Sequence, residues 1–222
     1  MSRARAEMIE DTRARLLASA RQAFATQGYA NTSMDDFTAR AGLTRGALYH
    51  HFGDKKGLLA AVVAQLDSEM DSRLQRITDE AADPWSGFCE RCRAYLRMAQ
   101  DGEIQRIVLQ DAPAVLGDTG SQQCCVESLR QRLEALMQAG VIHHAPSGAL
   151  AQLINGSLVN TALWIARDEH PGDRLEQGLQ ALELLLRGLS LTPTGNRQSA
   201  MRAWPGKSPE TPSTPLPARS GR

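Results

Sequence analysis

Apolar residues recur at intervals of three and four positions along most of the chain, and the alternation typical of strands is missing. The first stripe predicts a helix that ends at Gly28 and contains Ile9, Leu16, Leu17, Ala20, Ala23 and Phe24. Later stripes predict helices at about residues 55–81, 84–100, 121–140, 149–169 and 171–189. Asp54 and Asp83 precede two of these helices as predicted N-caps. We therefore expect an all-α fold with about nine helices in total.

Two short helical patterns follow the first helix and meet in a tight turn. Thr32 is the predicted N-cap of the first, with Asp35 three positions later as its capping partner. Gly42 suits the turn because a positive φ costs it no Cβ clash, and Leu43 is expected to anchor the turn in the core. Thr44 is predicted to cap the second helix. Two helices joined in this way are typical of a helix-turn-helix, which places its second helix in the major groove of DNA.

The second of these helices has an apolar face and a face for contacts with DNA. Leu48 and Phe52 share the apolar face, four residues apart. Arg45 carries a planar fork that matches guanine O6 and N7, and small neighbours let the helix approach the bases. Helix N-termini, and Lys55 at the start of the next helix, suit phosphate contacts. The residues predicted to bind DNA are Thr32, Ser33, Thr44, Arg45, Gly46, Ala47, Tyr49, His50 and Lys55.

An alternative interpretation is an aromatic patch in a helical hairpin, since this geometry also occurs in folds that bind no DNA. The complete string favours a DNA-binding motif, because it resembles the signature of TetR-family regulators. The matching residues are Thr32, Ser33, Met34, Ala39, Ala41, Gly42, Thr44, Arg45, Gly46, Leu48, Tyr49, His51, Phe52, Lys55 and Leu58. The chain departs from that signature at Phe37 and Thr38, where the family usually has a β-branched aliphatic residue and alanine. We expect slightly respaced packing between the two helices there.

The resemblance implies a sequence-specific transcriptional regulator, most often a repressor that a small-molecule effector releases from palindromic, double-stranded operator DNA. It also implies a homodimer formed by the last two helices, although an ordinary internal core is an alternative reading of their apolar stripes. The interface candidates are Leu150, Ile154, Leu158, Leu175, Leu179, Leu182 and Leu186. An effector pocket is expected in the C-terminal part. Its candidates are Phe88, Cys92, Tyr95, Met98, Leu109, Gln110, Asp111, Asn160 and Trp164.

The expected organisation has three regions. A TetR-like DNA-binding domain covers residues 10–54, with the helix-turn-helix at about 33–52, and continues into a linking helix at 55–81. An effector-binding and dimerisation domain covers 82–191, and a Pro-rich, basic tail expected to be disordered covers 192–222.

An overall charge of zero is unusual for a protein that binds nucleic acid, but the charge is unevenly distributed. The net charge is +3 over residues 1–60, −7 over 61–191 and +4 over 192–222. A positive N-terminal region in front of an acidic body is consistent with binding to phosphates.

The four cysteines suggest an alternative function, a thiol-based redox sensor or metal sensor. Cys89 and Cys92 are three positions apart on one predicted helix, and Cys124 and Cys125 are adjacent. A zinc site normally needs two pairs at defined spacing, and the adjacent pair fits that pattern poorly. Reduced thiols in a helical core are the simpler expectation.

Other classes of protein find little support in the sequence. It has no Gly-x-Ser-x-Gly elbow, no phosphate-binding glycine loop and no His-Glu-x-x-His, so we expect no enzyme and no cofactor. Apolar runs are expected to be too short to span a bilayer, and the first residues lack the apolar segment of a secretory signal. A cytoplasmic protein without membrane contact is therefore expected.

Overall fold

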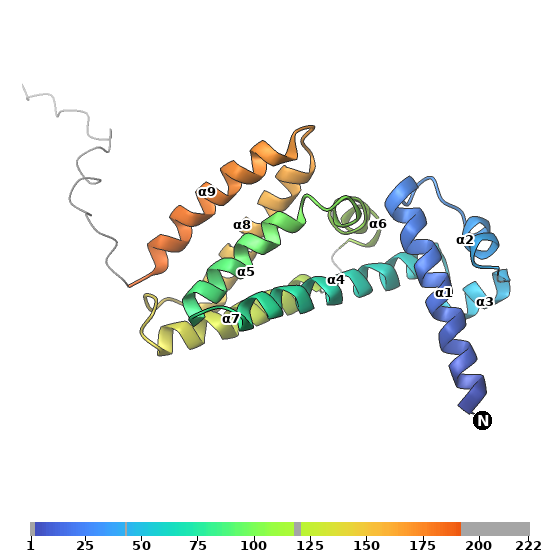
Figure 1. The fold of residues 1–222 in the computed structure, drawn as a ribbon, viewed down its shortest axis with the longest axis horizontal. Coiled ribbons are helices and arrows are strands. Elements are labelled where there is room, and N and C mark those ends of the chain that lie inside the picture. Colours follow the sequence, from blue (N-terminus) through green and yellow to red (C-terminus); the bar gives the residue numbers. More distant parts are fainter. Residues whose placement is uncertain (1–2, 43, 118–120, 192–222) are drawn as a thin grey trace, which may run out of the picture. The chain divides into compact units, whose positions relative to one another are not determined.

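The computed structural model describes residues 3–42, 44–117 and 121–191 (Figure 1). Leu43 and the predicted tail at 192–222 lie outside these residues. Every element named in the described ranges is a helix, which confirms the all-α prediction. The order is α1 (Arg3–Gln27), α2 (Met34–Ala41), α3 (Arg45–Phe52), α4 (Lys55–Asp79), α5 (Pro84–Met98), η1 (Ile104–Asp111), α6 (Ala112–Leu116), α7 (Ser121–Gln138), α8 (Ser147–Ala166) and α9 (Pro171–Leu189).

Local capping chemistry explains where α4 and α5 begin. The Asp54 carboxylate accepts a hydrogen bond from the Gly57 N–H at 2.6 Å, and the Asp83 carboxylate accepts from the N–H groups of Trp85 and Ser86. Each carboxylate satisfies backbone donors that have no partner inside the helix. Both predicted N-caps are confirmed.

The apolar stripes predict no helix for the segment between α5 and α7, and the structure differs. Ile104–Asp111 form a π-helix, η1, that continues directly into α6. The wider turn of a π-helix is rare and occurs mostly as short insertions, frequently at functional sites. Ile107 and Leu109 of η1 are buried.

The buried apolar side chains form two clusters. The first, called here the N-terminal core, consists of Leu16, Ala20, Ala23, Phe24, Phe37, Ala41, Leu48, Leu58, Leu59, Val62, Val63, Leu66, Ile107 and Ala112. The second, the C-terminal core, is built from α5, α7, α8, α9, η1 and the end of α4. Val108 of η1 packs against both clusters. The described residues up to Leu191 form one compact unit, in which α4 and η1 contribute to both cores.

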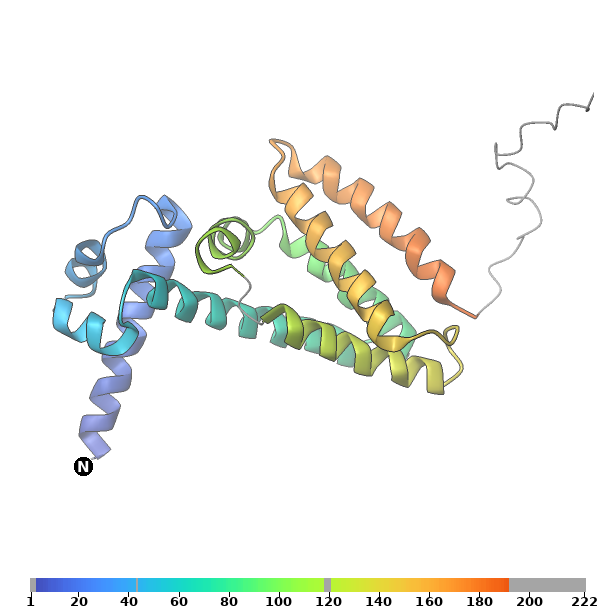
Figure 2. The same cartoon turned by 180° about the vertical axis from the view of Figure 1, so that it is seen from behind.

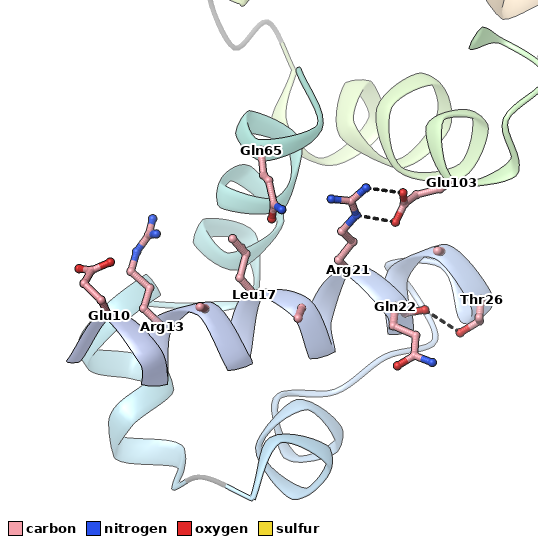
Figure 3. A pocket seen from close by; sticks show the side chains of 11 residues that line it. Glu10, Arg13, Leu17, Arg21, Gln22, Thr26, Gln65 and Glu103 are labelled. Carbon is pink, nitrogen blue, oxygen red and sulfur yellow. Dashed lines mark hydrogen bonds and ion pairs between the residues drawn. The ribbon is translucent and has the colours of Figure 1, made fainter. Parts of the chain in front are cut away.

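Polar contacts reinforce the junction between α1 and η1. The Arg21 guanidinium donates two hydrogen bonds to the Glu103 carboxylate, both at 2.7 Å (Figure 3). It donates a third to Glu69 of α4. After α1, the Tyr29 N–H donates to the Asp111 carboxylate at 2.8 Å. Arg106 Nη2 donates to the Gln27 carbonyl oxygen at 3.3 Å. The end of α1 is therefore tied to both ends of η1.

Helices α8 and α9 lie side by side in both views (Figures 1 and 2). Four of the leucines predicted for the dimer interface, Leu158, Leu175, Leu182 and Leu186, are buried within the single chain. These side chains pack in the C-terminal core, which is the alternative reading of the two stripes, and their place at a dimer interface stays a prediction. The other three, Leu150, Ile154 and Leu179, are partly buried against that core. The exposed large apolar residues of the two helices are Leu153, Trp164, Leu184 and Leu185.

One described helix, α8, is long and apolar enough to cross a membrane by length and composition alone. This corrects the expectation that no segment reaches that length. The same helix contributes Ala151, Leu158, Ala162 and Ile165 to the C-terminal core. The core helix of a soluble protein passes the same test, so α8 is weak evidence for a membrane span.

Gly28 provides a test of the junction between α1 and η1. Its φ is +76°, and a Cβ at this position would lie 2.2 Å from Arg106 Nη2. Gly28→Ala should therefore lower the free energy of unfolding by about 1–3 kcal/mol, through backbone strain and displacement of Arg106. The measurement is urea unfolding at fixed protein concentration.

Gly188→Ala in α9 is the matched control, since a Cβ there would meet no atom within 4 Å. It should be neutral or stabilise the protein by up to about 1 kcal/mol, because alanine is the better helix former. Equal destabilisation by both substitutions would contradict this account of the junction.

Candidate nucleic-acid interface

The N-cap of α2 is Ser33, one residue after the predicted Thr32. The Ser33 hydroxyl accepts from the Asp36 N–H at 3.2 Å, and the Asp36 carboxylate accepts from the Ser33 N–H at 3.0 Å, which completes a capping box. Hydrogen bonds from Ser33 lower the pKa of Asp36. Thr32 is buried and its hydroxyl donates to the Tyr29 carbonyl oxygen at 3.0 Å. Ser33 remains exposed at the helix start, whereas the Thr32 side chain points inward.

The turn and the start of α3 agree with the prediction. Gly42 has a φ of +63°, in the left-handed region where glycine is favoured, and ends α2. The Thr44 hydroxyl accepts a hydrogen bond from the Ala47 N–H at 3.3 Å and so caps α3. The structure therefore confirms the predicted turn at Gly42 and the predicted N-cap at Thr44.

The two faces of α3 are also as predicted. Leu48 is fully buried in the N-terminal core, and Phe52 is partly buried against it. On the other face Arg45, Gly46, Tyr49 and His50 are exposed, and Ala47 is half-buried. Tyr49 is 55 % exposed, unusually open for a large aromatic side chain. This face presents one cation, an imidazole, a phenol and two small residues to solvent.

Arg45 is paired with Asp35 of α2. Its Nε and Nη2 atoms each donate to one oxygen of the Asp35 carboxylate, and both side chains are exposed. The hydrogen bonds from Arg45 to Asp35 raise the pKa of Arg45. Asp35 therefore occupies the Nε–Nη2 edge of the guanidinium and orients its Nη1–Nη2 edge, the one that can face guanine O6 and N7.

Lys55 lies in a less open position than expected for a phosphate contact. Its ammonium is 4.2 Å from the centroid of the Tyr29 ring, in cation–π geometry. Burial lowers the pKa of Lys55, and the charges of Asp111 and Asp36 oppose this shift. The side chain thus connects the start of α4 to the junction between α1 and η1.

The structure separates the predicted effector-binding residues into groups. Phe88, Cys92, Met98 and Leu109 are buried together in the C-terminal core, and Tyr95 is partly buried against it. Burial raises the pKa of Tyr95. These five residues therefore belong to one cluster of packed side chains.

The other four candidates lie apart from that cluster. Asp111 accepts from the Tyr29 N–H, and Gln110 is exposed. Asn160 is exposed and donates to the Gly156 carbonyl oxygen, whereas Trp164 lies at the surface under the Arg174 guanidinium. Asp111 and Trp164 therefore have structural contacts that explain their presence.

One hollow in the described residues lies elsewhere, along α1. It is an open groove of about 520 Å³ whose lining includes Arg13, Leu17, Arg21, Gln65 and Glu103 (Figure 3). The second hollow, of about 50 Å³, lies between α5, α8 and α9. Neither coincides with the predicted effector candidates.

The cysteines do not have the properties of a sensor. Burial raises the pKa of Cys89 to about 11 and that of Cys92 to about 12, so both remain protonated at neutral pH. The thiolate is the reactive and metal-binding form of cysteine. All four cysteines are free, and the described residues contain no group of three or more His, Cys, Asp or Glu placed to hold a metal ion. The thiol-sensor alternative therefore lacks support.

Comparison with known proteins identifies the family. The model described as "Bacterial regulatory proteins, tetR family" matches residues 16–62, and "Tetracyclin repressor-like, C-terminal domain" matches residues 85–189. A TetR-family transcriptional regulator of known structure from Pectobacterium atrosepticum is 60% identical, with a TM-score of 0.79 over 87% of this chain and 100% of the other.

Two named relatives are also similar to this chain over most of its length. The HTH-type transcriptional repressor AcnR of Corynebacterium glutamicum is 35% identical over 63% of this chain and 73% of its own length. The Transposon Tn10 TetC protein of Escherichia coli is 29% identical over 71% of this chain and 81% of its own length. This chain belongs to the TetR family. As a TetR-family regulator it is a DNA-binding transcriptional regulator, the class that the sequence favoured over an enzyme.

The Arg45–Asp35 pair gives a prediction about how this TetR-family regulator selects DNA. Asp35→Asn should release the guanidinium for phosphate contacts and raise affinity for nonspecific duplex DNA about two- to fivefold, the range expected for an exposed ion pair. The ratio of specific to nonspecific affinity should fall. Fluorescence anisotropy with two duplexes at several salt concentrations measures both quantities.

Asp11→Asn is the control, because it removes the same charge from an exposed position of α1. It should leave the affinity ratio unchanged. The same fall in ratio for both variants would show that net charge, rather than the orientation of Arg45, is responsible.

Proposed function

We propose that this TetR-family regulator is a repressor that binds a palindromic operator through α3 and is released by a small-molecule effector. The observation that carries the proposal is the exposed face of α3, where Arg45, Tyr49 and His50 stand on a helix fixed by the Thr44 cap and by buried Leu48. A rigidly supported helix with an exposed Arg is what base reading in the major groove requires.

The contacts are proposed to divide into two kinds. Arg45 reads a base edge, with Gly46 and Ala47 allowing close approach, whereas Ser33 and Thr44 place helix N-termini near phosphates. Tyr49 and His50 contact phosphate or a thymine methyl group. Thr32 and Lys55 act through the structure of the domain, since Thr32 bonds to Tyr29 and Lys55 lies over the Tyr29 ring.

The distribution of charge supports an arrangement in which the N-terminal region of the chain faces the DNA. The net charge is +3 over residues 1–60 and −7 over residues 61–191. Phosphates attract the first region and repel the second, so the N-terminal end is favoured at the nucleic acid. We propose domain limits that follow this division: residues 10–54 for DNA binding, 55–81 for the linking helix, and 82–191 for effector binding and dimerisation. The cytoplasm is the proposed location.

The proposed homodimer uses the outer face of α8 and α9. Leu153, Leu184 and Leu185 are 60–71% exposed and belong to two neighbouring helices, and exposed apolar surface of this kind is typical of interaction sites. A two-fold dimer presents two α3 helices to half-sites about 34–36 Å apart, one turn of DNA. Leu150, Ile154 and Leu179 contribute the parts of their surface that the C-terminal core leaves uncovered.

The effector is proposed to act through α4 and η1. Helix α4 begins three residues after α3 ends, and both α4 and η1 supply side chains to the two cores. A ligand bound among α4, α5 and α7 therefore contacts an element that also supports the DNA-binding helix. A difference of about 1–3 kcal/mol in ligand affinity between two arrangements changes operator affinity about 5- to 150-fold.

Arg45→Ala tests the proposed role of α3. Loss of a good bidentate base contact costs about 1–3 kcal/mol, so operator affinity should fall about 5- to 150-fold with a smaller loss on nonspecific DNA. The measurement is a mobility shift on DNA flanking the coding region, with excess competitor DNA and a salt series.

Arg97→Ala on α5 is the control, since Arg97 is also exposed but lies far along the chain from α3. Its operator complex should match that of the unmodified protein. Equal losses on operator and nonspecific DNA for Arg45→Ala would contradict base reading, and absence of any specific complex would contradict the proposed function.

Leu184→Glu tests the dimer surface. A carboxylate at the centre of an apolar interface is left without a partner, so the protein should become monomeric at micromolar concentration and lose most operator affinity. Light scattering coupled to size-exclusion chromatography gives the mass. Met8→Glu, a change from an equally exposed apolar residue of α1, should leave the dimer intact. A dimer that survives Leu184→Glu would contradict this placement of the interface.

A further inference from the structure

The turn between α2 and α3 begins at a peptide group that is held by a side chain of α1. Helix α1 lies next to both α2 and α3 (Figures 1 and 2). Arg15 of α1 donates from Nη2 to the Ala41 carbonyl oxygen at 2.6 Å. This carbonyl belongs to the peptide unit that joins Ala41 to Gly42, the residue whose φ of +63° starts the turn. A Cβ built on Gly42 would lie 3.7 Å from the same Nη2 atom, so the guanidinium lies against the first peptide unit of the turn.

A second hydrogen bond between α1 and α2 lies one helical turn away. The Ser19 hydroxyl donates to the Phe37 carbonyl oxygen at 3.3 Å. Ser19 follows Arg15 by four residues and Phe37 precedes Ala41 by four, so each helix contributes two groups from one face. Together the two bonds define where α2 lies along α1. The bond from Arg15 is the one that reaches the turn.

The ends of α2 matter because the helix is short. Helices α2 and α3 have eight residues each, about two turns, so few internal hydrogen bonds define their geometry. The last carbonyl oxygens of a helix have no partner within it, and Arg15 supplies a donor to that of Ala41. A cation at this end is also favoured by the helix dipole. A single residue separates Gly42 from the Thr44 cap of α3, so the orientation of this peptide unit is passed on to α3.

We infer that Arg15 is a positioning residue for operator recognition, which orients the turn and thereby α3 without contacting DNA itself. Reading a base edge requires the side chain to be held within about 0.5 Å and 10–20° of the productive geometry. Contacts with phosphates carry no sequence information and depend mainly on charge. Loss of the Arg15 hydrogen bond should therefore weaken specific binding more than nonspecific binding. This inference rests on the proposed function, because it assumes that α3 reads the operator.

Arg15→Met tests the inference, since methionine keeps most of the apolar stem and removes the donors. The probes are a duplex from the DNA flanking the coding region that the unmodified protein shifts, and a shuffled duplex of the same length and composition. Affinity for the first should fall about three- to tenfold and affinity for the second less than about twofold, as for loss of one partly exposed hydrogen bond from a charged group. Fluorescence anisotropy over a salt series measures both affinities.

The salt series also distinguishes a positioning residue from a phosphate contact. The slope of log affinity against log salt concentration should be unchanged in Arg15→Met, whereas loss of a phosphate contact would reduce its magnitude by about one. Arg15→Lys keeps the charge and a donor for a single carbonyl oxygen, so it should restore the ratio of the two affinities to within about twofold of the unmodified protein.

Arg73→Met is the matched control, because it removes the same charge from an exposed position of α4. It should leave the affinity ratio unchanged. Thermal unfolding of each variant gives the folded fraction. If Arg15 served stability alone, its loss would lower both affinities by the same factor through the unfolded fraction, and the ratio would not move.

Three results would overturn the inference. They are an unchanged affinity ratio in folded Arg15→Met, a salt slope reduced by about one, and an Arg15→Lys variant with as low a ratio as Arg15→Met. A specific complex that Arg15→Met leaves intact would overturn only the role of Arg15. Absence of a specific complex with the unmodified protein would overturn the proposed function itself.

Discussion

The position of Ile107 constrains most of this structure. Ile107 belongs to η1, far along the chain from the helix-turn-helix, yet its side chain is fully buried in the N-terminal core with Phe24, Phe37 and Leu58. Burying a side chain of this size stabilises a protein by roughly 1.5–3 kcal/mol. The DNA-binding helices and the C-terminal helices are therefore not joined by α4 alone. Any movement of η1 has to be accommodated in the core that supports α3.

Polar groups around Ile107 give this contact a fixed geometry. Arg21 binds Glu103 at the start of η1, and Asp111 binds the Tyr29 N–H at its end. Such partly exposed pairs contribute little free energy, but they define which atoms must meet. Helix α4 supplies side chains to the N-terminal core and to the C-terminal core. Effector and operator would thus act on shared elements, as coupling between two sites requires.

Sequence reasoning predicted the elements whose signals are local. Asp54, Asp83 and Thr44 were identifiable because an N-cap acts on the next three residues. The cap of α2 was ambiguous, since Thr32 and Ser33 each precede an acid by three positions, and tertiary contacts of Thr32 decide between them. Periodicity placed Leu175, Leu182 and Leu186 of α9 on one face, but it does not tell whether that face packs within the chain or against a second copy. The π-helix depends on packing between distant segments, which the sequence pattern does not contain.

Hydrogen exchange in an Ile107→Ala variant tests most directly whether η1 is part of the core that supports the DNA-binding helix. The account predicts that amides of α1, α2 and α3 exchange faster by a similar factor, because a cavity in the N-terminal core destabilises these helices together. Leu133→Ala, which removes a fully buried side chain from the C-terminal core, should accelerate exchange in α7 and α8 first. Faster exchange confined to η1 and α6 in the Ile107 variant would contradict the account.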